Sequence, residues 1–103
     1  MQPPDLSLVR EFKRRAEAAL PGRVARAVLF GSRARGEAEA DSDWDVAVFL
    51  KDGATIEDTG RLADAAYDLI VESGEFIQPI AFAEGRTEDL QILRTIRDEG
   101  ILL

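Results

Sequence analysis

The sequence of 103 residues contains no cysteine and no histidine. Without them the chain cannot form disulfides or thiolate zinc sites, and it cannot use Cys or Ser-His nucleophiles or imidazole acid-base chemistry. Any catalysis must therefore use carboxylates, hydroxyls, lysine, arginine or a hard metal ion that prefers oxygen ligands. No stretch approaches the roughly 20 apolar residues of a membrane-spanning helix, and the amino terminus lacks the charge order of a signal peptide. We expect a cytoplasmic protein without membrane contact.

Acidic and basic residues are unevenly distributed along the chain. The net charge is −7, and 46% hydrophobic with 32% charged residues is typical of one globular domain, which we expect to span residues 1–103. Residues 1–35 hold eight of the thirteen Lys and Arg against three acids, a net +5, whereas residues 36–103 carry −12. This balance argues against direct nucleic-acid binding but leaves the first third attractive to phosphate. The cluster at Lys13, Arg14 and Arg15 is also consistent with an ordinary solvated helix face.

Hydrophobic periodicity predicts the elements of the first half of the chain. Apolar residues recur every three or four positions over residues 5–20, which predicts an amphipathic helix that Pro21-Gly22 ends. The apolar run 24–30 predicts a buried strand, and a polar loop is expected over 31–42. A second strand is expected over 43–50, with alternate side chains on opposite faces.

The second half is expected to hold two helices and one more strand. Thr55 and Asp58 resemble a capping box, and they predict a helix that ends at Gly74. The run 75–82 predicts a strand, in which Pro79 argues for a sheet edge or an early strand end because proline cannot donate a ladder hydrogen bond.

A last helix is expected to start from Thr87 as its cap, with Leu90, Leu93 and Ile96 turned inward. The order α-β-β-α-β-α predicts an α/β (α+β) fold in which helices pack on a small mixed sheet. The apolar tail 101–103 is consistent either with a patch left for a partner or with an edge strand that completes the core.

Gly31 and Ser32 come directly after the first predicted strand. A glycine there lets the backbone approach an anion closely, and the turn offers successive N–H groups and a hydroxyl, which would suit a triphosphate. Strand ends also carry Gly and Ser for turn geometry alone. The pair is therefore weak evidence when taken by itself.

Two acids open the second predicted strand. Asp43 and Asp45 are two positions apart, so their side chains share a face with Cα atoms roughly 6.6 Å apart. Acids so close repel unless a cation lies between them or both are solvated, and Asp45 lies within an apolar run where an acid needs a partner. Mg²⁺ suits the pair because it takes one or two carboxylates and completes its shell with phosphate oxygens and water. The alternative is a strand-entry turn whose acids face water.

The combination resembles a known family. Gly31-Ser32, ten intervening residues and Asp43-Trp44-Asp45 match the G-S-x10-D-x-D signature of the DNA polymerase beta-type nucleotidyltransferase superfamily. The surrounding stretch, residues 29–50, is similar to its smallest branch, the minimal nucleotidyltransferases. The resemblance covers most of the chain and implies the nucleotidyltransferase fold.

The resemblance also implies roles for individual residues. Gly31 and Ser32 would hold the β- and γ-phosphates of an NTP, and Asp43 and Asp45 would bind the Mg²⁺ that bridges those phosphates. Arg33 and Arg35 lie in the loop that could offset the charge of the triphosphate. The hydroxyl of an acceptor would attack the α-phosphorus and release pyrophosphate. A nucleoside monophosphate, most simply AMP from ATP, would then be attached to the acceptor.

The match fails at a third acid that active members of the family carry on the next strand, where this chain has Gln78. A neutral amide supplies no charge and takes no proton, which endangers activation of the attacking hydroxyl more than NTP binding. Three interpretations stay open: an active transferase that tolerates Gln78 or recruits Glu75, an NTP-binding regulatory subunit with little or no catalysis, and a structural partner that retains only a relic of the site.

The resemblance implies a partner as well. Relatives of this size work with a separate HEPN-domain ribonuclease as a toxin–antitoxin pair, in which the nucleotidyltransferase neutralises the toxin by binding it or by attaching AMP to it. An antitoxin role is therefore our leading expectation. Modification of an aminoglycoside-like molecule or of RNA is a weaker one, because the first usually needs another domain and the acidic surface disfavours the second.

Overall fold

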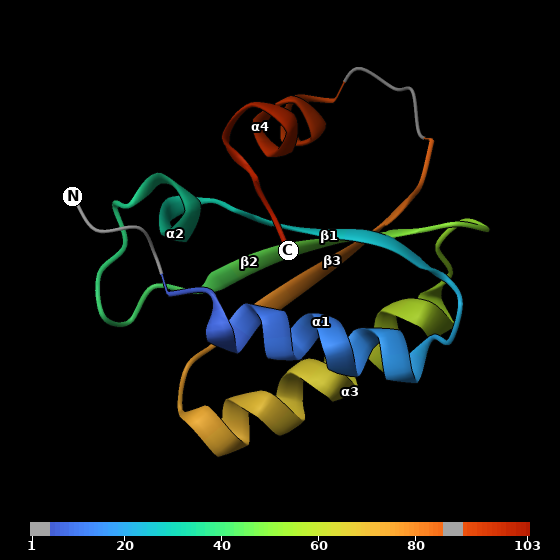
Figure 1. Ribbon diagram of the computed structural model, residues 1–103, viewed down its shortest axis with the longest axis horizontal. Coiled ribbons are helices and arrows are strands. Elements are labelled where there is room, and N and C mark those ends of the chain that lie inside the picture. Colours follow the sequence, from blue (N-terminus) through green and yellow to red (C-terminus); the bar gives the residue numbers. More distant parts are fainter. Residues whose placement is uncertain (1–4, 86–89) are drawn as a thin grey trace.

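The computed structural model describes residues 5–85 and 90–103 (Figure 1). In this part of the chain the elements are α1 (Ser7–Ala19), β1 (Val24–Phe30), α2 (Ser32–Arg35), β2 (Trp44–Leu50), α3 (Ile56–Ser73), β3 (Ile77–Ala83), α4 (Gln91–Glu99) and β4 (Ile101–Leu102). The mixed α/β architecture agrees with the sequence prediction. Two short elements, α2 and β4, are additions to the expected order.

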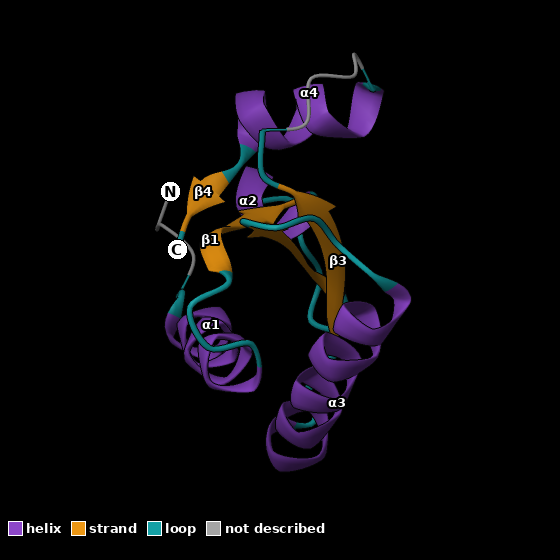
Figure 2. Cartoon of the chain, turned by 90° about the vertical axis from the view of Figure 1, so that its right-hand side faces the viewer, coloured by secondary structure: helices purple, strands orange, loops and turns teal. Residues whose placement is uncertain are grey.

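The strands form a single mixed sheet in the order β3-β2-β1-β4. β1 is antiparallel to both β2 and β4, whereas β2 is parallel to β3, so α3 serves as the crossover between them. Helices α1 and α3 cover one face of the sheet, and α4 lies over the other (Figure 2). This arrangement makes β3 an edge strand, as Pro79 predicts.

Alternation along β2 divides the apolar side chains between two clusters, one on each face of the sheet. The cluster under α1 and α3 receives the even-numbered residues of β2: Trp44, Val46, Val48 and Leu50. The cluster under α4 receives Ala47 and Phe49, and Phe49 stacks on Phe82 with ring centroids 5.4 Å apart. The period-two prediction for this strand is thus confirmed, and it puts Asp45 on the α4 side.

The start of α3 is fixed by polar contacts that the sequence indicates only in part. Thr55 and Asp58 form the predicted capping box, in which each side chain accepts a hydrogen bond from the other's backbone N–H. Asp58 is buried and also accepts from Arg23 at 2.7 and 3.0 Å. The hydrogen bonds from Arg23 lower the pKa of Asp58 to about 2. The helix ends at Gly74, which is in the left-handed conformation.

The structure differs from the sequence prediction in two details, at the loop 31–42 and at Leu90. The loop expected over 31–42 contains the single turn α2, which is too short to show a hydrophobic period. Leu90 was expected to face inward, but it is 38% exposed because it occupies the extended N-cap position before α4. Thr87, the predicted cap, lies outside the described residues.

The apolar tail completes the sheet. Val28 and Leu29 of β1 pair with β4, and the Leu103 N–H donates to the Ala27 carbonyl at 2.9 Å. Ile101 and Leu103 pack against the core, while Leu102 is 67% exposed. The edge-strand interpretation of the tail therefore holds, and Leu102 is the residue of the tail that is exposed.

Candidate functional site

The glycine of the Gly31-Ser32 turn lies directly against an acidic side chain. Gly31 ends β1 with φ +77° and ψ −160°, a conformation that is essentially restricted to glycine. A Cβ at this position would collide with Oδ2 of Asp45. The turn and the carboxylate are thus in contact although fourteen positions separate them in the sequence.

Asp45 lies near the start of β2, between two neighbouring strands. Its Cα pairs with Phe30 on β1 and with Gln78 on β3, and its side chain is half-buried. Burial raises the pKa of the Asp45 carboxyl, and the negative charge of Asp43 raises it further, while Arg35 partly offsets both. The two aspartates are therefore close enough to repel each other, which is the situation that a divalent cation relieves.

Asp43 lies one residue before β2 rather than in it, and its side chain is exposed. The backbone on either side of Asp43 is anchored. The Ser42 carbonyl accepts from Arg33 at 2.9 Å, and the Trp44 N–H donates to the carbonyl of Phe76 at 2.8 Å. The backbone next to Asp43 is therefore fixed by hydrogen bonds, and Asp43 lies close to Asp45.

Ser32 opens α2 and lies at the junction with β1. The first N–H groups of a helix have no intrahelical acceptor, and they can donate to an anion at that end of the helix. In α2 these are the N–H groups of Ser32 and Arg33. The Ser32 carbonyl is used within the turn, where it accepts from Gly36 and Glu37. The hydroxyl and the first amides of α2 are what this turn can offer to a phosphate.

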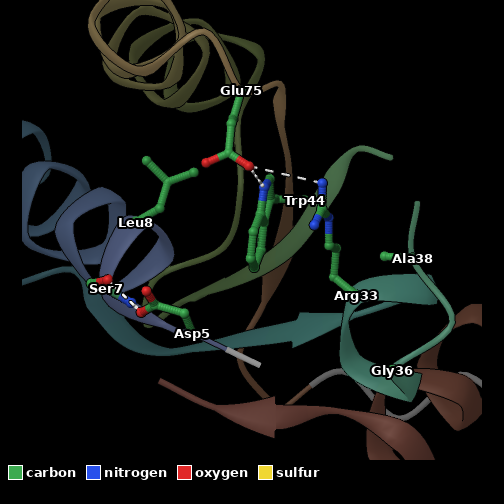
Figure 3. A pocket seen from close by; sticks show the side chains of 8 residues that line it. All are labelled: Asp5, Ser7, Leu8, Arg33, Gly36, Ala38, Trp44 and Glu75. Atoms are coloured by element: carbon green, nitrogen blue, oxygen red, sulfur yellow. Dashed lines mark hydrogen bonds and ion pairs between the residues drawn. The ribbon is translucent and has the colours of Figure 1, made fainter. Parts of the chain in front are cut away.

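The two arginines of the loop go to opposite faces of the sheet. Arg35 lies near Asp45, and it pairs with Glu37 and with Glu99 of α4, both at 3.1 Å. Arg33 instead lies over the ring of Trp44, whose side chain belongs to the α1 and α3 side (Figure 3). The structure therefore brings Arg35, but not Arg33, to the face that carries Asp45.

Gln78 lies beside Asp45 on the neighbouring strand, because the two are register partners in the parallel β2–β3 pair, and it is exposed. No acid takes its place: within residues 5–85 and 90–103, no group of three or more acidic side chains is gathered as a metal site. Glu75, the possible substitute, precedes β3 and accepts from the Trp44 indole N–H at 3.3 Å on the other side of the strand. The site therefore has two carboxylates and one amide.

Residues outside the motif contribute to the site, and Glu99 is the one that sequence reasoning missed. It is 64 positions from Arg35 and comes close only because α4 folds over the sheet. No local pattern indicates it. The basic cluster of α1 has an ordinary explanation, since Arg14 and Arg15 pair with Glu11, and Arg15 also pairs with Glu72 of α3.

In the part of the chain that the structure describes, no helix is long and apolar enough to cross a bilayer.

A four-stranded mixed sheet with a Gly-Ser turn against paired aspartates defines the class of nucleotidyltransferase-fold domains. The family described as polymerase beta nucleotidyltransferase matches residues 16–103, so the chain belongs to that family. A candidate protein adenylyltransferase of Methanocaldococcus jannaschii is 29% identical over 77 residues, 75% of this chain and 78% of that protein.

Two solved structures show the same fold. A candidate minimal nucleotidyltransferase is 31% identical with a TM-score of 0.59, and the match covers 96% of each chain. The crystal structure of a toxin–antitoxin with AMP-PNP has a TM-score of 0.65 at 16% identity, covering 88% of this chain and 68% of that one. The predicted resemblance to minimal nucleotidyltransferases is confirmed.

Proposed function

We propose that this chain is an Mg²⁺-dependent nucleotidyltransferase that moves AMP from ATP to a hydroxyl acceptor. The observation that carries the proposal is the contact between Gly31 and Asp45. It places a turn suited to phosphates directly against a carboxylate suited to a metal ion. Gly31 and Ser32 hold the β- and γ-phosphates, and Asp43 and Asp45 hold the Mg²⁺.

The donor set fits this cofactor. Two carboxylates repel each other across a half-buried site, and Mg²⁺ prefers one or two carboxylates together with phosphate oxygens and water. When bound, the ion neutralises charge on the triphosphate. Arg35 adds positive charge from the protein on the same face.

The reaction joins the acceptor oxygen to the α-phosphorus and breaks the bond between the α- and β-phosphates, so that pyrophosphate leaves. The protein mainly positions the groups and offsets their charge. The attacking hydroxyl also loses a proton. Gln78 is a neutral amide and cannot take it, so the proton would pass to Asp43, Asp45 or water.

The register partnership of Gln78 with Asp45 favours a second candidate function. With two carboxylates the site can hold Mg²⁺–ATP, yet it lacks the charge that would bind a second metal ion near the acceptor. The chain would then be a nucleotide-binding regulatory subunit that neutralises its partner by binding alone.

For the biological role, we propose the antitoxin of a pair whose toxin is a HEPN-domain protein. The likeness to a toxin–antitoxin structure that contains AMP-PNP supports this role, and so does the likeness to a candidate protein adenylyltransferase. Leu102, exposed at the edge of the sheet, is available for contact with such a partner.

The two candidate functions are separated by following the label from ATP. The chain is incubated with Mg²⁺, a cell lysate and ATP labelled on either the α- or the γ-phosphate. A nucleotidyltransferase transfers the α-label to an acceptor and leaves the γ-label in pyrophosphate, and Asp43→Asn/Asp45→Asn transfers neither. Saturable ATP binding without transfer of label supports the regulatory subunit instead.

A further inference from the structure

Arg33 is bound by the loop that leads to the acidic pair. From α2 its guanidinium donates to the Ser42 carbonyl at 2.9 and 3.2 Å and to the Ala40 carbonyl at 3.2 Å. Ser42 in turn caps the same loop, since its Oγ accepts from the Glu39 N–H at 2.9 Å. A single side chain therefore holds the segment that immediately precedes Asp43.

The guanidinium is itself locked in place. It lies 4.3 Å from the centre of the Trp44 ring, and one of its nitrogens is 3.9 Å from Glu75, which also accepts from the Trp44 indole (Figure 3). The Arg33 side chain is only 15% exposed, and Trp44 is buried. Arg33 is thus fixed by the residue that separates the two aspartates in the sequence.

These contacts restrain the chain on both sides of Asp43. Arg33 holds the Ser42 carbonyl before it, and the Phe76 carbonyl holds the Trp44 N–H after it. Asp45 is already fixed inside β2. The Arg33 contacts are therefore among those that restrain Asp43 next to Asp45.

We propose that Arg33 is a positioning residue, which sets the place of Asp43 relative to Asp45 and thereby the metal affinity of the pair. This inference rests on the proposed function of the two aspartates. It differs from the nucleotide-binding role expected for Arg33, because Nε and one terminal nitrogen of the guanidinium donate to backbone carbonyls and the guanidinium lies over the ring of Trp44.

Arginine suits this role better than lysine does. Its planar fork reaches two carbonyls while it stacks on an aromatic ring, whereas an ammonium group is a single point of charge. Arg33→Lys should therefore preserve the charge and the fold but loosen the loop. Arg33→Gln removes the charge and the stacking as well.

The chain offers a matched control in Arg26. This arginine also lies over a ring, 3.8 Å from the centre of Phe49, and it pairs with Glu84. It is the register partner of Phe49, near the end of β2 that is remote from Asp45. Arg26→Gln removes a ring contact and an ion pair away from the site, but no hydrogen bond to the loop.

The test measures Mn²⁺ affinity in the presence of ATP, by electron paramagnetic resonance of the free ion, and amide hydrogen exchange over residues 39–44. We expect Arg33→Gln to weaken Mn²⁺ binding about tenfold, the size of a lost positioning contact of about 1.4 kcal/mol. Arg33→Lys should show a smaller loss, and both variants should exchange faster over the loop. Arg26→Gln should match the wild type in both measurements.

The inference would be overturned if Arg33→Lys had the same Mn²⁺ affinity and the same loop exchange as the wild type. This holds even if Arg33→Gln fails to fold. Equal losses in Arg33→Gln and Arg26→Gln would also overturn it, because they would indicate general destabilisation. Failure of the wild type to bind Mn²⁺ with ATP counts instead against the proposed function. In that case, amide hydrogen exchange over residues 39–44, measured without metal, still shows whether Arg33 holds this loop in place.

Discussion

Asp45 of β2 and Gln78 of β3 are register partners in the parallel part of the sheet. Side chains at paired positions of neighbouring strands project from the same face, so the amide lies where a third carboxylate would complete the acidic group. Whether the proposed transferase is active therefore depends mainly on the side chain of Gln78. Under the proposed function, nucleotide binding would depend on Asp43 and Asp45, whereas turnover would depend on the residue at position 78.

Restoring the acid tests this directly. Gln78→Asp should increase transfer of the α-label from ATP, because a third carboxylate strengthens binding of a second metal ion near the acceptor. Gln78→Asn is the matched control, since it has the shape of Asp without its charge. The rates of both variants are compared with wild type over a range of Mg²⁺ concentrations. Equal rates for the Asp and Asn variants would contradict the assignment of Gln78 to the third position.

Gly31→Ala should damage both the fold and the site. The conformation of Gly31 disfavours any side chain by about 1–3 kcal/mol, and the added Cβ would also collide with Asp45. Gly74→Ala is the control, because Gly74 is left-handed with open space around it and should lose only about 1 kcal/mol. Urea unfolding measures the free energies. The prediction is wrong if the two variants lose equal stability and bind ATP equally well.

Glu99→Gln should strengthen ATP binding. Glu99 of α4 pairs with Arg35 and, under the proposed function, would compete with the triphosphate for it, so the substitution leaves the arginine with its ion pair to Glu37. Exposed ion pairs contribute up to about 1 kcal/mol, so the dissociation constant for Mg²⁺–ATP should fall roughly two- to fivefold. Glu84→Gln removes a comparable pair, with Arg26, away from the site. Unchanged or weaker ATP binding in Glu99→Gln would show that Arg35 does not contribute to nucleotide binding.

Acid should weaken the fold through Asp58. Its pKa is lowered from 3.8 to about 2 by the hydrogen bonds from Arg23. The charged carboxylate therefore stabilises the fold fully above about pH 4, and this contribution is lost as the pH falls through 2. Asp58→Asn should reduce the free energy of unfolding near neutral pH, and its difference from wild type should shrink toward pH 2.

The control for the acid experiment is Asp68→Asn, at an exposed position on the same helix. It should leave the free energy of unfolding unchanged within error. A difference between wild type and Asp58→Asn that stays constant from neutral pH to about pH 2 would show that the ionised pair with Arg23 is not what stabilises this corner.

Local patterns were sufficient for most of the fold. The alternation of β2, the capping box at Thr55 and the edge position of Pro79 each follow from residues within a few positions of one another. The turn α2 and the strand β4 could not be predicted in this way. A single helical turn has no period, and two residues form a strand only where β1 leaves an open edge for them.

The candidate site shows the same limit. Spacing indicated Gly31, Asp43 and Asp45, but the contact of Gly31 with Asp45 depends on the register of β1 and β2. Arg33 lies over Trp44 and Arg35 lies near Asp45, because their side chains reach opposite faces of the sheet. Their similar positions in the sequence give no indication of it.

The proposed Mg²⁺–ATP site is tested most directly by calorimetric titration of ATP, with and without Mg²⁺, into the wild type and Asp43→Asn/Asp45→Asn. If Asp43 and Asp45 hold Mg²⁺–ATP, binding should be saturable, should require Mg²⁺ and should be at least about tenfold weaker in the double variant, a loss of about 1.4 kcal/mol or more. Binding that is equal with and without Mg²⁺, or no binding to the wild type at millimolar ATP, would contradict the proposed site.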